Sequence, residues 1–338
     1  MAIEDVLVTI IHTFNELPLT TFLVAVGAFT MLKVTFKALN VFLQTFIIPG
    51  ISVTLKRFGA KQGAWAVVTG ATDGIGKEFA FQLAKAGFHV VLVARNNDLL
   101  ASTASELSAK YPESLTATHS IDFAKANDND YAELESALST RDVGVLVNNV
   151  GKSHNIPAYL VDTPIDEMTD IVAINVNATL RVTKAVVPLM IQKKRGLILN
   201  IGSFAGAIPS PMLATYSGTK AFLATFSGAL GEELKQHNIV VELVNTYFVT
   251  SKLSKIRKPS SMVPRPDTYV RWVLAKIGLP CGAAFSNRPN TSTPFWSHSL
   301  LDYGMTLFGR GSFFVSYTHS LHKDIRRRAL KKLERKGQ

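Results

Sequence analysis

A short apolar run at residues 64–68 leads into a turn with three glycines, and helical spacing follows that turn. Glycine lets the backbone bend sharply and approach a pyrophosphate closely. The N-terminus of the helix that follows presents free N–H groups, which favour an anion at this place. The chain is therefore constrained to a strand–turn–helix unit that can hold a dinucleotide. The residues that we assign to this role are Gly70, Thr72, Asp73, Gly74, Ile75 and Gly76.

Strand patterns and helix patterns alternate along the chain after this turn. A long helix is expected around residues 168–189, and another helix runs to about residue 237. Alternation of this kind implies a parallel sheet with right-handed crossovers. We expect one doubly wound α/β domain over residues 63–256, with separate segments at 1–62 and 257–338. The further strands are predicted at 89–93, 115–121, 143–147, 196–201 and 239–244.

The ends of the predicted strands carry side chains that could select the cofactor. Chains that bind NAD carry an acid about 20 residues beyond the glycines, whereas this chain has Arg95 there. A guanidinium can pair with a 2′-phosphate through two hydrogen bonds, so we predict NADPH/NADP+ as the cofactor. The alternative is a solvated arginine at a strand end. Asp122 can accept a hydrogen bond from the adenine amino group, and Asn149 lies where the chain passes the adenosine ribose.

Tyr216 and Lys220 are four residues apart, so they share one face of a helix. A tyrosine with a pKa of about 10 is a poor acid at neutral pH, and a neighbouring ammonium should lower that pKa. Lys220 can also hold the nicotinamide ribose hydroxyls. Ser203, just after the fifth strand, can donate to a carbonyl oxygen, and Asn175 can hold a water that links Lys220 to solvent. These four candidate catalytic residues suit hydride addition to a carbonyl.

The ordered motifs resemble those of the short-chain dehydrogenase/reductase family. That family is marked by TGxxxGxG, here residues 69–76, by NNxG, here residues 148–151, and by Asn-Ser-Tyr-Lys catalysis. The resemblance covers about residues 63–256 and implies a Rossmann-like fold. The chain departs from the family pattern at Val150, where alanine is usual, and at Thr246, where a proline–glycine pair often follows the sixth strand.

Residues 245–254 are similar to a segment of the membrane-bound 3-oxoacyl-CoA reductases of microsomal fatty-acid elongation, which are relatives of the 17β-hydroxysteroid dehydrogenases. This resemblance implies that the Val249 backbone and the Ser251 side chain contact the nicotinamide end of the cofactor. It also implies NADPH-dependent reduction of long- or very-long-chain 3-oxoacyl-CoA at the cytosolic face of the endoplasmic reticulum membrane. The partners implied are membrane lipid and the 3-oxoacyl-CoA synthase, 3-hydroxyacyl-CoA dehydratase and enoyl-CoA reductase of elongation.

The N-terminal segment is apolar over residues 17–32 and again over 38–53. A bilayer needs about 20 apolar residues, so the first run spans only with help from its flanks or by tilting. Acidic residues precede the run and basic residues follow it, which under the positive-inside rule places the rest of the chain in the cytosol. We predict a membrane anchor and linker over residues 1–62. The alternative is a hydrophobic helix packed on the same protein.

The formal charge of +11 calls for an anionic partner or surface. Nucleic acid, an anionic membrane leaflet and an acidic ligand such as a CoA thioester are the candidates. No zinc spacing or aromatic RNA-binding signature accompanies the basic residues, so we expect no nucleic-acid partner. Cys281 is the only cysteine, so an intramolecular disulfide is excluded, and we expect no metal site.

The last third of the chain should cover the substrate. We expect a lid and acyl-chain wall over residues 252–277. Residues 295–317 are rich in aromatic side chains and are either interfacial or tunnel-forming, or a packed extension of the core. The basic residues between 323 and 336 either contact anionic lipid or form a solvated helix. In the second case the residues packed inward would be Leu321, Ile325, Leu330 and Leu333.

Two other functional interpretations stay open at this point. A steroid or retinoid ketoreductase could use the same catalytic residues, because substrate choice lies in the variable C-terminal region. A non-catalytic NADP-binding scaffold of a membrane complex is also conceivable, although the complete catalytic set argues against it.

Overall fold

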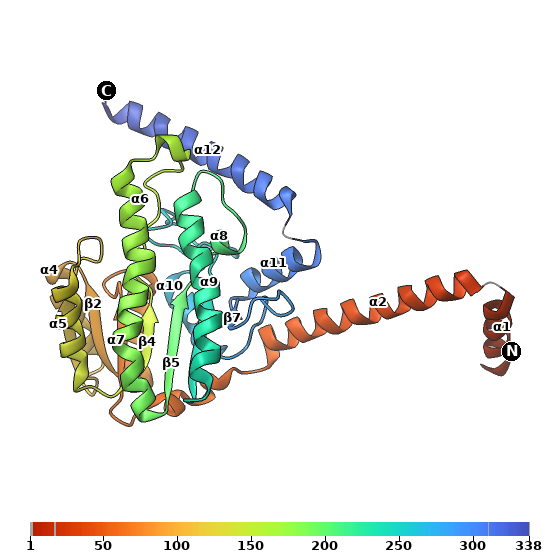
Figure 1. Cartoon of the computed structure of the whole chain (residues 1–338), viewed down its shortest axis with the longest axis horizontal. Coiled ribbons are helices and arrows are strands. Elements are labelled where there is room, and N and C mark those ends of the chain that lie inside the picture. The colour runs from red at the N-terminus through yellow and green to blue at the C-terminus, as the bar shows by residue number, and fades with distance from the viewer. Residues whose placement is uncertain (1–2, 17, 310, 338) are drawn as a thin grey trace.

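Seven parallel strands form the sheet at the centre of the computed structural model, which describes residues 3–16, 18–309 and 311–337 (Figure 1). The strand order is β3-β2-β1-β4-β5-β6-β7, so the winding direction changes between β1 and β4. Ligands of such sheets bind outside the carboxyl ends of the strands at this point. The strands are β1 (Trp65–Thr69), β2 (His89–Ala94), β3 (Thr116–Ser120), β4 (Val143–Asn148), β5 (Gly196–Ile201), β6 (Ile239–Val244) and β7 (Thr291–Ser292).

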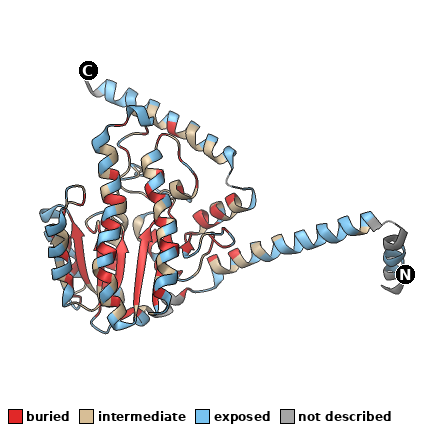
Figure 2. Cartoon of the chain, viewed as in Figure 1, coloured by how far each residue is buried: buried red, intermediate tan, exposed pale blue. Residues whose placement is uncertain are grey.

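The central strands are apolar along their whole length because both faces of the sheet are covered. Successive side chains of a strand point to opposite faces. In β1, Ala66 and Val68 belong to the core on one face, whereas Val67 belongs to the core on the other. Figure 2 shows the strands at the centre buried throughout. The six strands predicted from the sequence are confirmed, and β5 and β6 have the predicted bounds.

A layer of helices lies on each face of the sheet. Phe79 and Val273 fix α3 and α10 to one core cluster, and Leu138 and Val186 fix α5 and α7 to the other. The helices on the two faces are α3 (Gly74–Ala86), α4 (Asn97–Lys110) and α10 (Pro266–Ala275), and then α5 (Asp128–Ser139), α7 (Ala178–Lys193) and α9 (Ala214–Lys235). The other elements are α1 (Ile3–Glu16), α2 (Pro18–Phe42), α6 (Ile165–Val172), α8 (Phe204–Ala207), α11 (Trp296–Leu307), α12 (Ser312–Gly337), the 3₁₀ helices η2 (Ile51–Phe58) and η3 (Leu160–Asp162), and the π turns η1 (Leu43–Ile47) and η4 (Ala173–Asn177).

The packed core continues past residue 256. The seventh strand, β7, was not expected, and it pairs parallel to β6 through Leu243–Thr291 and Val244–Ser292. Tyr269 of α10 is fully buried against the same core as α3. For the segment before α10, residues 252–265, the expected lid role stays a prediction. The division of the chain into three parts stays a prediction too.

Helix α2 extends away from the domain that carries the sheet (Figure 1). Together with η1 it forms one helix over Leu19–Ile47 that is long and apolar enough to cross a membrane, and its apolar part is not buried inside the protein. Phe29 is 68% exposed and Leu32 is 70% exposed. The alternative of a hydrophobic helix packed on its own protein is therefore wrong for α2. Leu17, the first residue of the expected apolar run, lies outside the described residues.

The root of α2 is held firmly by the domain. The Thr45 and Ser299 hydroxyls form a buried hydrogen bond of 2.7 Å. The Gln44 side-chain oxygen accepts the Cys281 N–H at 2.9 Å. The Lys276 ammonium donates to the Ile48 carbonyl at 2.6 Å. Hydrogen bonds from η1 and its C-cap Ile48 thus join the end of the anchor candidate to the domain that carries the sheet.

Helix α12 lies across the top of the domain in Figure 1. Leu321 and Ile325 are half-buried on its inner face, as the solvated-helix interpretation expects. Leu330 and Leu333 are 39% and 58% exposed, so the expectation that they pack inward is wrong. The last turns of α12 leave the surface on which its earlier turns pack.

Candidate active site

The glycine turn after β1 is tightly packed. Gly70 has a φ of +66°, and its N–H donates to the Val93 carbonyl at 2.8 Å. A Cβ added to Gly76 would lie 2.2 Å from the Gly70 carbonyl oxygen. Because no side chain fits at that distance, α3 can start this close to the turn only with glycine at position 76.

The start of α3 can receive an anion. Asp73 precedes the helix, but its side chain caps no backbone N–H, so the first N–H groups stay available to a ligand. The loop after β6 lies against this turn: a Cβ on Gly74 would be 3.5 Å from the Ser251 Cβ, and the Lys252 ammonium lies 3.4 Å from the Asp73 carboxylate. Thr72 is half-buried, and Ile75 packs partly against the core.

Asn149 connects the end of β4 to the glycine turn. Its side-chain nitrogen donates to the Thr69 carbonyl at 2.9 Å and to the Gly70 carbonyl at 3.3 Å, and its backbone N–H donates to the Thr69 hydroxyl at 3.0 Å. The amide therefore fixes the shape of the glycine turn. Its direct contact with the cofactor ribose stays a prediction.

Arg95 and Asp122 follow the neighbouring strands β2 and β3, so they lie at the same edge of the sheet as the glycine turn. The Arg95 side chain is exposed. Its neighbour Asn96 accepts the Leu99 N–H at 2.8 Å and caps α4. Asp122 accepts the Ala124 N–H at 3.2 Å. Both side chains are placed to meet the adenosine end of a dinucleotide, and that contact also stays a prediction.

Three candidate catalytic side chains meet beyond the end of β5. Ser203 caps α8, where its hydroxyl accepts the Ala205 N–H at 3.2 Å. Ser203 also forms a hydrogen bond with the Tyr216 phenol. The Lys220 ammonium lies 5.8 Å from the centre of the Tyr216 ring and donates to the Ile201 carbonyl at 2.8 Å. The Ile201 carbonyl at the end of β5 therefore fixes the position of the Lys220 amine. Along α9, this lysine follows Tyr216 by about one helical turn.

The electrostatics of this group differ from the expectation. Burial raises the pKa of Tyr216, and the hydrogen bond from Ser203 lowers it in part. Burial lowers the pKa of Lys220 to about 8. The pKa of the phenol is therefore shifted upward, opposite to the direction that we expected from a neighbouring Lys220, because the loss of water around the buried ring outweighs the hydrogen bond of Ser203.

Asn175 lies in the π turn η4, which interrupts the predicted long helix between α6 and α7. Such turns occur frequently at functional sites. The Asn175 side chain is buried and donates to the Thr219 hydroxyl at 2.9 Å, next to Lys220. A Cβ on Gly151 would lie 3.4 Å from the Asn175 Oδ1 and 3.7 Å from the Lys220 Nζ. Glycine at 151 thus leaves open the space between amide and amine, where the expected water would lie.

The segment after β6, residues 245–254, forms hydrogen bonds among its own polar groups. The Ser254 hydroxyl donates to the Val249 carbonyl at 2.6 Å, and the Ser251 and Ser254 hydroxyls are 3.2 Å apart. Val249 itself is buried in the core. The loop is therefore shaped by internal hydrogen bonds, and the contacts of Val249 and Ser251 with nicotinamide stay predictions.

A buried amide network beneath the site was missed from the sequence. The Asn148 side chain donates to the Asn200 oxygen at 2.8 Å and to the Thr183 hydroxyl at 2.9 Å. Asn200 donates in turn to the Ser227 hydroxyl at 2.9 Å. The signal was available, because an asparagine inside the apolar run of β5 needs buried partners.

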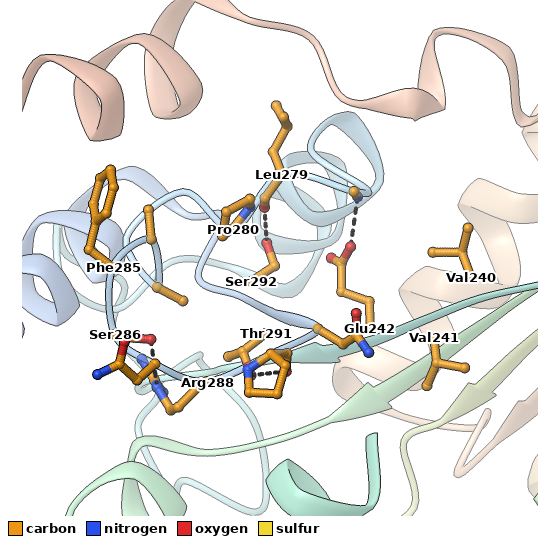
Figure 3. Close-up of a pocket in the computed structure, with 16 residues that line it drawn as sticks. Val240, Val241, Glu242, Leu279, Pro280, Phe285, Ser286, Arg288, Thr291 and Ser292 are labelled. Atoms are coloured by element: carbon orange, nitrogen blue, oxygen red, sulfur yellow. Dashed lines mark hydrogen bonds between the residues drawn. The ribbon is translucent and has the colours of Figure 1, made fainter. Parts of the chain in front are cut away.

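A cavity of about 560 Å³ lies beside β6, and none of the candidate catalytic residues lines it (Figure 3). Glu242 of β6 is 4% exposed, and its carboxylate accepts the Gly278 N–H at 2.7 Å. Burial raises the pKa of Glu242 to about 8, against the effect of that hydrogen bond. The Ser292 hydroxyl donates to the Leu279 carbonyl at 2.7 Å. These two bonds hold the segment after α10 against the sheet.

Known proteins with similar sequences were compared with the chain. The sequence profile described as short chain dehydrogenase matches residues 64–260. A very-long-chain 3-oxoacyl-CoA reductase of Laccaria bicolor is 69% identical over 317 residues, which are 94% of this chain and 93% of the relative. A very-long-chain 3-oxoacyl-CoA reductase of Aspergillus oryzae is 48% identical over 93% of this chain and 90% of the relative.

Solved structures agree with this comparison. A short-chain dehydrogenase from Sphingobium yanoikuyae in complex with NADPH has a TM-score of 0.58 and 25% identity, and the match covers 72% of this chain and 94% of that one. A bulky-bulky ketone specific alcohol dehydrogenase from Comamonas testosteroni has a TM-score of 0.58 and 26% identity, over 72% and 93% of the two chains.

Proposed function

This chain belongs to the short-chain dehydrogenase family, and we propose from that premise that it reduces long- and very-long-chain 3-oxoacyl-CoA to 3-hydroxyacyl-CoA with NADPH. One observation carries the proposal: Ser203, Tyr216 and Lys220 meet at the carboxyl edge of the sheet, in a chain 69% identical to a very-long-chain 3-oxoacyl-CoA reductase. The reaction is the second step of microsomal fatty-acid elongation.

The residues around the glycine turn fit a dinucleotide. The space that a Cβ at Gly76 would fill is taken by the turn itself, and the α3 N-terminus has free N–H groups beside it. Gly70, Gly74 and Thr72 would hold the phosphates, and Arg95 would pair with the 2′-phosphate that distinguishes NADPH from NADH. When bound, the cofactor supplies the hydride.

The protein's own part of the reaction is to polarise the carbonyl and to protonate it. The Ser203 hydroxyl would donate a hydrogen bond to the substrate carbonyl oxygen, where negative charge develops. The Tyr216 phenol, next to Ser203, would give its proton to that oxygen. Lys220, with its pKa lowered to about 8, would return a proton toward the phenol at neutral pH. Asn175 would hold a water in the gap left by Gly151, which connects the amine to solvent.

The same proposal places the protein in the endoplasmic reticulum membrane. Helix α2 would be the anchor, with the catalytic domain facing the cytosol because the basic residues follow the apolar run. The 3-oxoacyl-CoA synthase, the 3-hydroxyacyl-CoA dehydratase and the enoyl-CoA reductase of elongation would be its partners. Phe204 directly follows Ser203 and packs with Ile208 and Met305 in a buried apolar cluster, so one wall beside the site is apolar.

The test is an assay of the full chain in detergent. NADPH oxidation should follow addition of a C18 3-oxoacyl-CoA, with estrone supplied in parallel as a substrate of the related steroid enzymes. The Tyr216→Phe variant keeps the ring and loses the proton, so it should show at least a hundredfold lower kcat. Equal rates of the two proteins on the acyl-CoA, or a preference for estrone, would contradict the proposal.

A further inference from the structure

We propose that the hollow between the basic half of α12 and the wall of the active site binds the phosphate groups of the CoA part of the substrate. This inference rests on the proposed function, because only an acyl-CoA brings such phosphates to this wall. The hollow measures about 370 Å³. Four of the residues that line it are basic, namely Lys323, Arg326, Arg327 and Lys331, and they are joined by Tyr159 and Met212.

Helix α12 is fixed over this place by its own side chains. The His322 Nδ1 lies 2.7 Å from the Pro211 carbonyl oxygen, and the Arg326 guanidinium donates to the Pro157 carbonyl at 2.9 Å. Arg326 also lies 3.5 Å from the Asp162 carboxylate. The basic half of the helix is therefore docked on two loops, so the hollow is a built feature and not a gap beside a loose tail.

One of the two loops leads directly into α9, which carries Tyr216, and the other loop is bonded to it. The Ala158 N–H donates to the Met212 carbonyl at 2.9 Å and joins them. Met212 stands four residues before Tyr216, and the Ser210 N–H donates to the Ser217 hydroxyl at 3.1 Å. A ligand in the hollow would therefore lie on the outside of the same wall whose inside carries the catalytic phenol. The flexible arm of CoA is what would connect the two places.

Two of the four basic side chains that face the hollow, Lys323 and Lys331, are not neutralised by an acidic side chain among the described residues, whereas Arg326 and Arg327 are paired. Lys323, Arg327 and Lys331 are spaced four residues apart, so they form one row on α12, and like charges in such a row repel each other. Arg327 pairs with Asp324 at 2.6 Å, whereas Lys323 and Lys331 form no ion pair with any described residue. Glu334 is the one acidic residue in the lining. A bound polyphosphate would relieve this repulsion.

The position of the hollow favours CoA over a lipid headgroup as the source of the phosphates. In Figure 1, α2 leaves the domain toward the right, whereas the basic half of α12 runs to the upper left. A bilayer that surrounds α2 therefore lies on the other side of the domain. Under the proposed function the phosphates of the dinucleotide bind at the glycine turn, so they are not the ligand of the hollow.

The test compares two substrates that differ only in the phosphates. One is a C18 3-oxoacyl-CoA, and the other is the same acyl group on N-acetylcysteamine. In the full chain, the Lys323→Gln/Lys331→Gln double variant should raise KM for the CoA thioester about tenfold and leave KM for the cysteamine thioester within about twofold. Glutamine has nearly the helix propensity of lysine, so the helix is kept. Lys332→Gln, exposed on α12 and outside the hollow, is the matched control and should change neither KM.

The KM of the unsubstituted enzyme for the CoA thioester should also rise with salt, and the double variant should flatten this dependence. Equal changes in both KM values, or in neither, would overturn the inference. Loss of binding to phosphatidylserine vesicles with unchanged KM values would overturn it as well and assign the basic row to lipid. Absence of turnover of either thioester by the unsubstituted enzyme would refute the proposed function itself.

Discussion

Asn175 holds the backbone of Lys152 by two hydrogen bonds at once: its Oδ1 accepts the Lys152 N–H at 2.8 Å, and its Nδ2 donates to the Lys152 carbonyl at 2.9 Å. Lys152 directly follows Gly151, so this pair joins the helix of the π turn to the loop after β4. The amide is thus both a structural clamp and a neighbour of Lys220, the candidate catalytic amine.

The clamp predicts a loss of stability in Asn175→Ala. The substitution removes both hydrogen bonds to the partly buried backbone of Lys152, which costs about 1–2 kcal/mol of the free energy of unfolding. Asn177→Ala removes an exposed amide from the same π turn and should change that free energy by less than about 0.5 kcal/mol. Urea denaturation of the two variants checks this. Equal stabilities would show that the clamp carries little energy.

Arg95 should determine the choice between the two nicotinamide cofactors. In Arg95→Ala the exposed guanidinium is gone, so Kd for NADPH should rise about tenfold or more, while Kd for NADH should stay within about twofold. Isothermal titration with both dinucleotides measures the two constants. A loss of affinity that is the same for NADH and NADPH would mean that the arginine does not meet the 2′-phosphate.

Lys220→Met should remove activity and change the pH dependence of stability. Burial lowers the pKa of Lys220 from 10.5 to about 8, so the folded state disfavours the ammonium. The destabilisation is fully present below pH 8 and disappears as pH rises from 8 to 10.5. Relative to the unsubstituted protein, the Tm of the variant should therefore be higher at pH 7 than at pH 10. Differential scanning fluorimetry measures this difference, and kcat should fall at least a hundredfold. A Tm difference independent of pH would contradict the assigned shift.

Glu242→Gln tests a buried carboxyl away from the catalytic centre. Burial raises the pKa of Glu242 from 4.5 to about 8, so its contribution to stability is lost as pH rises from 4.5 to 8. The amide can still accept the Gly278 N–H and carries no charge. The Tm of the variant should equal that of the parent near pH 4.5. At pH 8 it should be higher by about 2–4 °C or more. Parallel Tm curves for the two proteins would rule this out.

The strands that could be predicted from the sequence are those whose own side chains form a recognisable apolar pattern. β5 and β6 are apolar runs buried on both faces, and their predicted bounds match the structure. β7 has only Thr291 and Ser292, and its place depends on backbone bonds such as Leu243 N–H to the Asn290 carbonyl at 2.7 Å. No local pattern encodes a pairing between segments about 50 residues apart.

The candidate catalytic residues could be named from motifs, but their physical state could not. The Asn175 side chain bonds to the backbone of Lys152, which lies 23 positions earlier in the chain. The depressed pKa of Lys220 depends on how completely the folded chain removes it from water. Spacing along a sequence reports that an amine and a phenol share a helix face, and it does not report the dielectric around them.

The three hydrogen bonds at the root of α2 replace what would otherwise be a flexible linker. With α2 in a bilayer, any change in its tilt would be passed on to the catalytic domain as a rigid rotation. A thicker membrane makes such a helix stand more upright, and a thinner one makes it lean. The height and angle of the candidate active site above the lipid would then vary with bilayer thickness, which depends on the length of the acyl chains in the lipid.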